Sequence, residues 1–523
     1  MSLLQKSAFE IAALIKSRQA SALEVLEENI AQVEKVDGAS GSLNGDNNSE
    51  PDKVHSFITK TYDLARAQAL EVDRKVAAGA EPGLLAGVPV TIKDIFCLQD
   101  TSSTAASKIL ANFTAPYTAT SVQRWVDQGA VVLGKVNLDE FTFGSSNESS
   151  AFKPHPRNPW NTGKVAGGSS GGSASAVAAY EGAISLGTDT SGSIRLPASY
   201  CGTVGLKPTY GRVSRYGLIA FGSSLDCPGP LTRDSRDAAL ALQAMAGADP
   251  NDSTCAAVPV PNYIQELEKG VKGLRIGLSP DYFKITMMDA ATGKLMEHEL
   301  PTRIRAEVYR AAELLAQAGA EIVEGVQMPH TRYGIPAYFV ISRVEAASNL
   351  HRFDGVKYGH RSTSAYNGLS EMYRKTRGEG FGGQPKLRIL MGMYVSAAQY
   401  SEQYYARALK IRTLIRGDFD KAFANLDLLL TPSTPSPAFD IGGIFGDTVL
   451  MQYADQFLVP GNHAGIPAIS LPAGLDESGM PLAIQLYAND YREDLLLRAG
   501  HIYEAQTAKE TWRTQRPALE GTL

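Results

Sequence analysis

The stretch GGSSGGSASA, at residues 167–176, carries the most information about the fold. Glycine has no Cβ, so the four glycines of this stretch let backbone amides approach a ligand closely. A phosphate-binding P-loop is disfavoured because no Lys follows the last glycine. The string fits the G-x-S-x-G nucleophile elbow at Ser169 and at Ser170, but an elbow follows a buried strand and residues 157–166 are polar. A flexible glycine loop remains an alternative for this stretch taken alone.

A second Gly/Ser element follows, ISLGTDTSGSIRLPASYCG at residues 184–202. Its apolar start predicts a strand that runs into a turn of four small residues, Thr190, Ser191, Gly192 and Ser193. Consecutive backbone N–H groups in a tight turn suit a developing oxyanion. The turn therefore predicts an oxyanion hole, with Ser193 placed to attack a carbonyl held there; an ordinary strand-to-helix turn is the alternative.

The third element is GVPVTIKDIF, at residues 87–96, in which Lys93 stands between apolar neighbours. Burial lowers the pKa of a lysine from about 10.4 and can bring a general-base lysine to roughly 7–8. A lysine at a strand end that reaches solvent is the alternative. The eight histidines show no metal-ligand spacing, so a zinc hydrolase is not supported.

In order and spacing, the three elements together resemble the amidase signature family, from about residue 84 to the C-terminal helix. The resemblance implies a catalytic Lys93, a Ser169 held by a cis peptide bond and a nucleophilic Ser193. It implies an α/β fold: a large, mixed, twisted β-sheet core covered by helices on both faces. Ser191 stands where the family usually has a second glycine, so we expect its amide to remain a donor and its side chain to alter the pocket lip.

Within the family, three segments look like the A subunits of glutamyl-tRNA(Gln)/aspartyl-tRNA(Asn) amidotransferases: residues 134–152, 205–233 and 428–439. Those subunits hydrolyse free glutamine. The resemblance implies that Arg388 binds the α-carboxylate of glutamine and that Asp455 binds its α-ammonium group. The charges agree, since a guanidinium fork suits a carboxylate and an aspartate complements an ammonium group.

The same resemblance implies a heterotrimer. A B subunit binds the misacylated tRNA and uses ATP and Mg²⁺ to activate its carboxylate, a small C subunit holds the other two together, and the A subunit needs no cofactor. Whether Glu-tRNA(Gln), Asp-tRNA(Asn) or both are served stays open. The alternatives are a stand-alone amidase for another carboxamide, a non-catalytic scaffold subunit, and an α/β hydrolase with Ser170 as its nucleophile.

The pattern of predicted helices and strands divides the chain into an N-terminal helical region at residues 1–80 and a catalytic domain at residues 81–523. Two S-x-x-E capping boxes, at Ser7 and at Ser21, predict the first two helices. Residues 37–54 are Gly-, Ser-, Asn- and Asp-rich and predict a polar surface insertion; part of residues 289–304 reads as another. Between residues 165 and 230 the only helix we predict is SASAVAAYEG, residues 173–182.

Composition sets the class of protein. The 523 residues are 44% hydrophobic, so a large core is available, and 50 Lys plus Arg against 55 Asp plus Glu give a net charge of −5. With no basic block, most contact with a nucleic acid must come from a partner. The four cysteines form no C-x-x-C, and no apolar run is long enough to span a membrane. We expect a cytoplasmic protein, with an organellar matrix or stroma as the open alternative.

Overall fold

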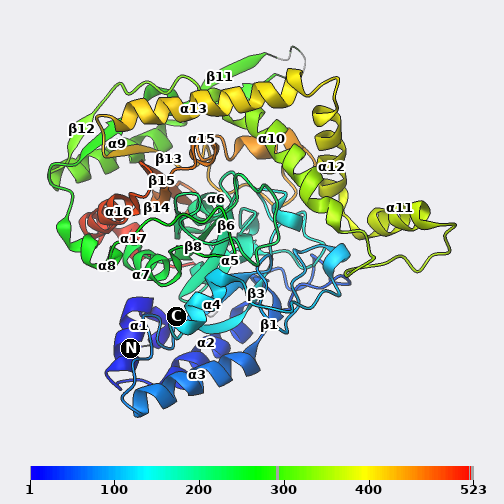
Figure 1. Ribbon diagram of the computed structural model, residues 1–523. Coiled ribbons are helices and arrows are strands. Elements are labelled where there is room, and N and C mark those ends of the chain that lie inside the picture. The colour runs from blue at the N-terminus through cyan, green and yellow to red at the C-terminus, as the bar shows by residue number, and fades with distance from the viewer. Residues whose placement is uncertain (1, 290–291, 293, 518, 520–523) are drawn as a thin grey trace.

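The computed structural model describes residues 2–289, 292, 294–517 and 519. Within them a mixed sheet of eleven strands crosses the molecule, and helices flank it (Figure 1). The α/β fold with a large mixed sheet is therefore confirmed. The strand order is β1-β3-β2-β6-β8-β7-β14-β15-β13-β9-β12. Pairing is parallel along β3-β2-β6 and along β13-β9-β12, and antiparallel elsewhere.

The strands of this sheet have the following bounds: β1 Phe57–Lys60, β2 Pro89–Lys93, β3 Val131–Val136, β6 Ile184–Asp189, β7 Val204–Lys207, β8 Cys227–Thr232, β9 Arg275–Leu278, β12 Glu321–Val323, β13 Leu428–Pro432, β14 Ala468–Leu475 and β15 Pro481–Ala488. Two small antiparallel pairs lie outside it: β4 Arg157–Asn158 with β5 Asn161–Val165, and β10 Lys284–Met288 with β11 Leu295–Glu299.

The α-helices have the following bounds: α1 Ala8–Lys16, α2 Ala22–Val36, α3 Tyr62–Ala77, α4 Thr120–Asp127, α5 Gly171–Ala178, α6 Arg195–Cys201, α7 Ser235–Met245, α8 Tyr263–Glu266, α9 Thr302–Gln317, α10 Gly334–Asn349, α11 Leu369–Gly380, α12 Gly383–Ser396, α13 Arg407–Phe423, α14 Thr448–Tyr453, α15 Val459–Ala464, α16 Glu493–Thr507 and α17 Thr511–Thr514.

The first two helices begin where the capping boxes predict. At α1 the box is complete, because the Ser7 hydroxyl accepts the Glu10 N–H and the Glu10 carboxylate accepts the Ser7 N–H. At α2 the Ser21 hydroxyl accepts the Glu24 N–H. Asp73 of α3 accepts the two N–H groups that follow Ser21, at 2.7 and 3.1 Å. A carboxylate from a neighbouring helix thus completes the second cap.

The N-terminal region is joined to the sheet. Asp237 of α7 accepts the N–H groups of Ala8 and Phe9 at the start of α1. Strand β1, which the sequence did not indicate, adds an edge strand to the sheet through β3. Apolar residues of α1 to α3 belong to the same buried cluster as the sheet. The division of the chain near residue 80 stays a prediction.

Helix α6 shows that the prediction of a single helix between residues 165 and 230 was wrong. Its seven residues contain a proline and follow a Gly/Ser turn, so its sequence carries weak helix signals. Strand β8 was also missed, because Pro228 and Pro230 argue against a central strand.

The first insertion is tied to the catalytic domain. Ser42 and Lys153 exchange two backbone hydrogen bonds of 2.8 Å. In the second insertion, residues 290, 291 and 293 lie outside the described residues, and its described part includes β11, paired with β10.

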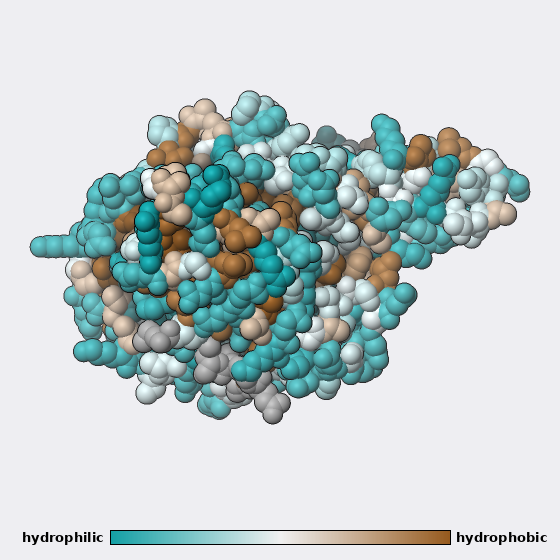
Figure 2. Space-filling view, turned by 90° about the horizontal axis from the view of Figure 1, so that it is seen from below, coloured by the Kyte–Doolittle hydropathy of each residue, from teal (hydrophilic) through white to brown (hydrophobic). Residues whose placement is uncertain are grey.

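An arm that carries α11 projects from the right of the molecule in Figures 1 and 2. On the face seen in Figure 2, hydrophilic side chains cover most of the surface and apolar ones are interspersed. Among the described residues, no helix combines the length and the apolar character that a membrane span requires.

Helices α10 and α12 pack closely, and Gly392 of α12 lies at their contact. A Cβ at Gly392 would be 2.0 Å from the carbonyl oxygen of Arg343 on α10. The approach of the two helices therefore depends on the missing side chain, in the way that small residues allow backbones to come close.

We expect Gly392→Ala to lower the free energy of unfolding by about 2 kcal/mol, because the added methyl group overpacks the contact between α10 and α12. The matched control is Gly378→Ala on α11, where a Cβ would meet nothing within 4 Å. That variant should be neutral or roughly 0.5–1 kcal/mol more stable, since alanine has the higher helix propensity. Chemical denaturation of both variants tests this, and equal midpoints would contradict it.

Candidate active site

Two parallel strands bring the first site residues to one edge of the sheet. Strands β2 and β6 pair in register, with Ile92 opposite Leu186, so their carboxyl ends lie side by side. Lys93 is the last residue of β2, and Thr188 lies at the end of β6. The loop to α5 and the turn after β6 meet at this edge.

The loop before α5 holds Ser169 and Ser170. The peptide bond between Gly168 and Ser169 is cis. A Cβ at Gly168 would lie 2.0 Å from Oδ2 of Asp139, so only glycine fits there. The Asp139 carboxylate in turn accepts the Asn147 N–H at 2.9 Å, which fixes the neighbouring loop.

Lys93 is fully buried, and its amine is held by three hydroxyl groups. Nζ lies within hydrogen-bond distance of Oγ of Ser169 at 2.7 Å, of Oγ of Ser170 at 2.8 Å and of Oγ1 of Thr188 at 2.9 Å. Burial lowers the pKa of the amine to about 7. Nearby carboxylates, Asp139 first among them, oppose this shift without cancelling it. A large fraction of the amine is therefore neutral at neutral pH.

The turn after β6 is anchored by a buried ion pair. The Asp189 carboxylate binds the Arg195 guanidinium through Nε at 2.9 Å and through Nη2 at 3.0 Å. It also accepts a 2.8 Å hydrogen bond from the Asn462 amide. Although burial raises the pKa of Asp189, the Arg195 charge holds it below its ordinary value. The two ends of the turn are thereby clamped together.

This turn contains the predicted oxyanion donors. Within the described part of the chain, no acceptor takes the backbone N–H of Ser191, Gly192 or Ser193. The Thr190 side chain is directed elsewhere, because its hydroxyl donates to Asp226 at 2.7 Å. Gly192 has φ +154°, and a Cβ there would lie 2.6 Å from Cδ1 of Leu458.

Ser193 lies against the loop that carries Ser169. The Ser170 N–H donates to the Ser193 carbonyl at 3.2 Å, and the Ser193 side chain is nearly buried. Among the hydrogen bonds of the described residues, none joins the Ser193 hydroxyl to the Ser169 hydroxyl. The structure thus brings Lys93 and Ser169 into direct contact and places Ser193 beside them.

Asp455 and Arg388 lie at the same site. Oδ2 of Asp455 accepts hydrogen bonds from the hydroxyls of Ser145, at 2.9 Å, and Ser191, at 3.1 Å. Its Oδ1 has no partner in the described residues, and burial raises the pKa of Asp455 to about 7. The Arg388 guanidinium lies over the ring of Phe143, 4.9 Å from its centre, and its Nε and Nη1 likewise have no partner there.

Ser191 departs from the family pattern with a structural consequence. Its hydroxyl orients Asp455, so the side chain does more than alter the pocket lip. Sequence reasoning missed Asp139, Ser145 and Thr188 as neighbours of the site. Asp139 and Ser145 lie in a segment that resembled the family, but the role of each depends on which loop folds over it.

His463 follows Asn462 in the chain, and its ring contacts the backbone of α10. Nε2 of His463 lies 2.9 Å from the Gly334 carbonyl, to which it donates, and burial lowers the pKa of this histidine to about 4. All four cysteines are free. Among the described residues, no three His, Cys, Asp or Glu side chains are arranged to hold a metal ion.

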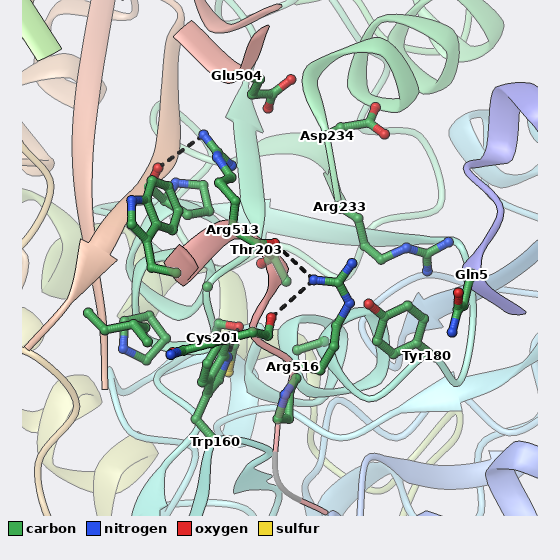
Figure 3. A pocket seen from close by; sticks show the side chains of 18 of the residues that line it. Gln5, Trp160, Tyr180, Cys201, Thr203, Arg233, Asp234, Glu504, Arg513 and Arg516 are labelled. Atoms are coloured by element: carbon green, nitrogen blue, oxygen red, sulfur yellow. Dashed lines mark hydrogen bonds between the residues drawn. The ribbon is translucent and has the colours of Figure 1, made fainter. Parts of the chain in front are cut away.

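A surface pocket of about 410 Å³ lies apart from this site (Figure 3). It is lined by Gln5 from the N-terminus, Arg513 and Arg516 from the C-terminal segment, and Trp160 and Arg233 between them. None of the predicted site residues lines it.

The amidase family model matches residues 48–497. The chain belongs to the amidase family. It is 47% identical over 490 residues to the A subunit of the glutamyl-tRNA(Gln) amidotransferase of Koribacter versatilis, covering 94% of this chain and 96% of that one. The protein is thus an enzyme of the amidase type.

Solved structures agree with this assignment. The A subunit of the glutamyl-tRNA(Gln) amidotransferase of Thermotoga maritima superposes with a TM-score of 0.77 at 32% identity, covering 99% of both chains. A 6-aminohexanoate cyclic dimer hydrolase gives 0.80 at 27% identity, covering 99% of both chains. The same fold therefore occurs in one subunit of an amidotransferase and in a 6-aminohexanoate cyclic dimer hydrolase.

The lowered pKa of Lys93 predicts a pH dependence of stability. The pKa of Lys93 is about 7 in the folded chain and has its ordinary value of 10.5 in the unfolded chain. Between these two pH values the unfolded chain binds more protons at Lys93 than the folded chain does. The contribution of Lys93 to the free energy of unfolding therefore rises with pH across this window. Lys93→Met removes the group, so its stability advantage over the wild type should be largest near pH 6 and shrink towards pH 9.

Thermal unfolding at several pH values measures this difference. Lys509→Met, at an exposed lysine, serves as the control and should show no such trend. A difference between Lys93→Met and the wild type that does not change with pH would refute the neutral buried amine.

Proposed function

We propose that this protein is the glutamine-hydrolysing subunit of a tRNA-dependent amidotransferase. One observation carries the proposal: a buried amine in contact with Ser169 lies beside the Ser193 turn, next to Arg388 and Asp455, whose Nε, Nη1 and Oδ1 atoms find no partner among the described residues. The buried amine and the Ser193 turn suit amide hydrolysis. The guanidinium group and the carboxylate suit an amino acid substrate. The names of the full-length relatives agree with this.

In the proposed reaction, neutral Lys93 takes a proton from Ser169 while Ser169 takes one from Ser193. The Ser193 oxygen then forms a bond to the side-chain carbonyl carbon of glutamine. The Ser169 and Ser193 hydroxyls must come into hydrogen-bond contact for this step, and substrate binding would bring them together.

The amides of residues 190–193 form the proposed oxyanion hole, and each such donor is typically worth about 3–4 kcal/mol in the transition state. The tetrahedral intermediate collapses as the C–N bond breaks and the proton on Lys93 passes to the leaving ammonia. Water then attacks the acyl-enzyme, which releases glutamate and restores the Ser193 hydroxyl.

Arg388 and Asp455 fix the substrate. The guanidinium would bind the α-carboxylate, and Oδ1 of Asp455 would accept the α-ammonium group. The raised pKa of Asp455 fits this role, because an ammonium group beside it would favour the ionised carboxylate. An aliphatic or aryl amide would leave both charges without a partner.

The ammonia would pass to a B subunit that binds the misacylated tRNA and uses ATP and Mg²⁺, with a small C subunit completing a heterotrimer. This chain would need no cofactor of its own. The net charge of −5 fits a division of labour in which a partner binds the tRNA. A translation complex of this kind would be cytoplasmic or lie in an organellar matrix or stroma.

Substitutions of the three catalytic groups test the chemistry. We expect Ser193→Ala to reduce kcat for glutamine hydrolysis by at least about 10⁴-fold and Lys93→Ala by at least about 10³-fold. Ser170→Ala should lose much less, because Ser170 is not the nucleophile. The readout is ammonia release. If Ser170→Ala abolishes ammonia release and Lys93→Ala reduces it only slightly, an α/β-hydrolase mechanism is favoured. If Ser193→Ala leaves ammonia release unchanged, a scaffold role is favoured.

Substitutions of the charged pair test the substrate. Arg388→Met and Asp455→Asn should each raise KM for glutamine by about 10²-fold, because each removes one charge-assisted contact with the bound amino acid. Hydrolysis of an uncharged amide should change little. If the wild type hydrolyses such an amide and ignores glutamine, the protein is a stand-alone amidase.

A further inference from the structure

Among the described residues four arginine side chains are buried, and two of them form ion pairs. Arg195 forms the bidentate ion pair with Asp189, and Arg212 pairs with Glu493 at 3.4 Å. Arg388 and Arg343 are 2% and 1% exposed, and neither forms an ion pair with a described residue. The Arg343 Nε and two nitrogens of Arg388 have no hydrogen-bond partner there. An unpaired buried guanidinium is costly, so such a group calls for an explanation.

Arg343 and Arg388 come from the two closely packed helices. Arg343 lies on α10 and Arg388 on α12, one turn from the contact at Gly392. The Arg343 guanidinium lies over Phe339, 3.8 Å from the ring centre, and Nη1 donates to the Ser342 hydroxyl at 2.9 Å. These contacts orient the group, while its Nε has no partner among the described residues.

Tyr338 connects Arg343 to the substrate site. Its ring lies 5.7 Å from the Arg343 guanidinium and packs edge-on against Phe221, whose ring centre lies 5.9 Å from the Arg388 guanidinium. Burial raises the pKa of the Tyr338 phenol, and Arg388, Arg343 and Ser191 all oppose that shift. The phenol therefore interacts with both guanidinium groups and with the turn of the proposed oxyanion hole.

The two guanidinium groups also act on each other. Burial lowers the pKa of Arg343 well below its ordinary value, and the charge of Arg388 lowers it further. Tyr338, Asp139 and Asp455 oppose the lowering of the Arg388 pKa, whereas among the described residues Tyr338 alone opposes that of Arg343. Two like charges that act on each other in the interior favour the binding of an anion near them.

We propose that Arg343 is a second carboxylate-binding residue of the substrate site, so that its guanidinium and that of Arg388 hold one substrate carboxylate together. A carboxylate has lone pairs enough for two guanidinium groups. This inference rests on the proposed function only for the choice of glutamine as the ligand. It makes Arg343 a specificity-determining residue, since an uncharged substrate would leave two buried cations unpaired.

The test measures binding to Ser193→Ala protein by calorimetry, with L-glutamine and L-glutaminamide, in which a carboxamide replaces the α-carboxylate. Arg343→Met should weaken glutamine binding at least tenfold and change glutaminamide binding less than twofold. Arg343→Lys keeps the charge but lacks the planar guanidinium group. Its affinity for glutamine should therefore lie between those of the parent protein and Arg343→Met. Arg513→Met is the matched control, because Arg513 also stacks on an aromatic ring but lies in the separate pocket of Figure 3.

Stability separates a binding role from a structural one. Without ligand, Arg343→Met should unfold at the same temperature as the parent protein or higher, because it removes an unpaired buried charge. Equal losses of affinity for both ligands, or unchanged glutamine binding, would overturn the proposal. If the parent protein binds no glutamine, the proposed function fails by itself, and glutarate then serves as the probe. In that case glutarate should raise the unfolding temperature of the parent protein and not that of Arg343→Met, and the absence of any rise in the parent would overturn the anion site.

Discussion

The Lys93 amine lies out of contact with solvent and is hydrogen-bonded to the hydroxyls of Ser169, Ser170 and Thr188. An amine in this setting can be stable only if its charge is largely given up or compensated, and here the lowered pKa shows that burial prevails. The same hydroxyls keep the amine hydrogen-bonded when it is neutral. Because β2 ends in the interior, the Lys93 amine can act as a base near neutral pH. Its three hydrogen-bond partners are hydroxyl groups rather than an imidazole.

The elements around this amine are short and made of residues with weak preferences for regular structure. The Ser193 turn is held by the ion pair of Asp189 with Arg195, and the Ser169 loop is held by close contacts that only glycine permits. Such segments keep one conformation because buried charges and tight packing surround them. Rigidity at this site therefore comes from tertiary contacts, which is what preorganised catalytic groups require.

At the ligand end of the site, stability and recognition oppose each other. Arg388, Arg343 and Asp455 are buried with nitrogen or oxygen atoms that no described residue satisfies. Replacing them with apolar side chains would be expected to stabilise the fold. Their presence is understandable if a zwitterionic ligand completes the hydrogen bonds. The Ser191 hydroxyl fits this explanation, because its hydrogen bond orients the Asp455 carboxylate.

The sequence alone determined the family and the sheet-rich α/β class and predicted the reactive groups, because Gly/Ser turns and a lysine among apolar residues are local signals. Strand β6 was predicted from the apolar start of residues 184–202. Strand β8, with its prolines, and the seven-residue α6 were decided by the sheet that surrounds them, since pairing with distant segments outweighs weak local preference. The tertiary structure alone brought Arg343 to Arg388 and Ser191 to Asp455, because each pair joins segments separated by dozens to hundreds of residues.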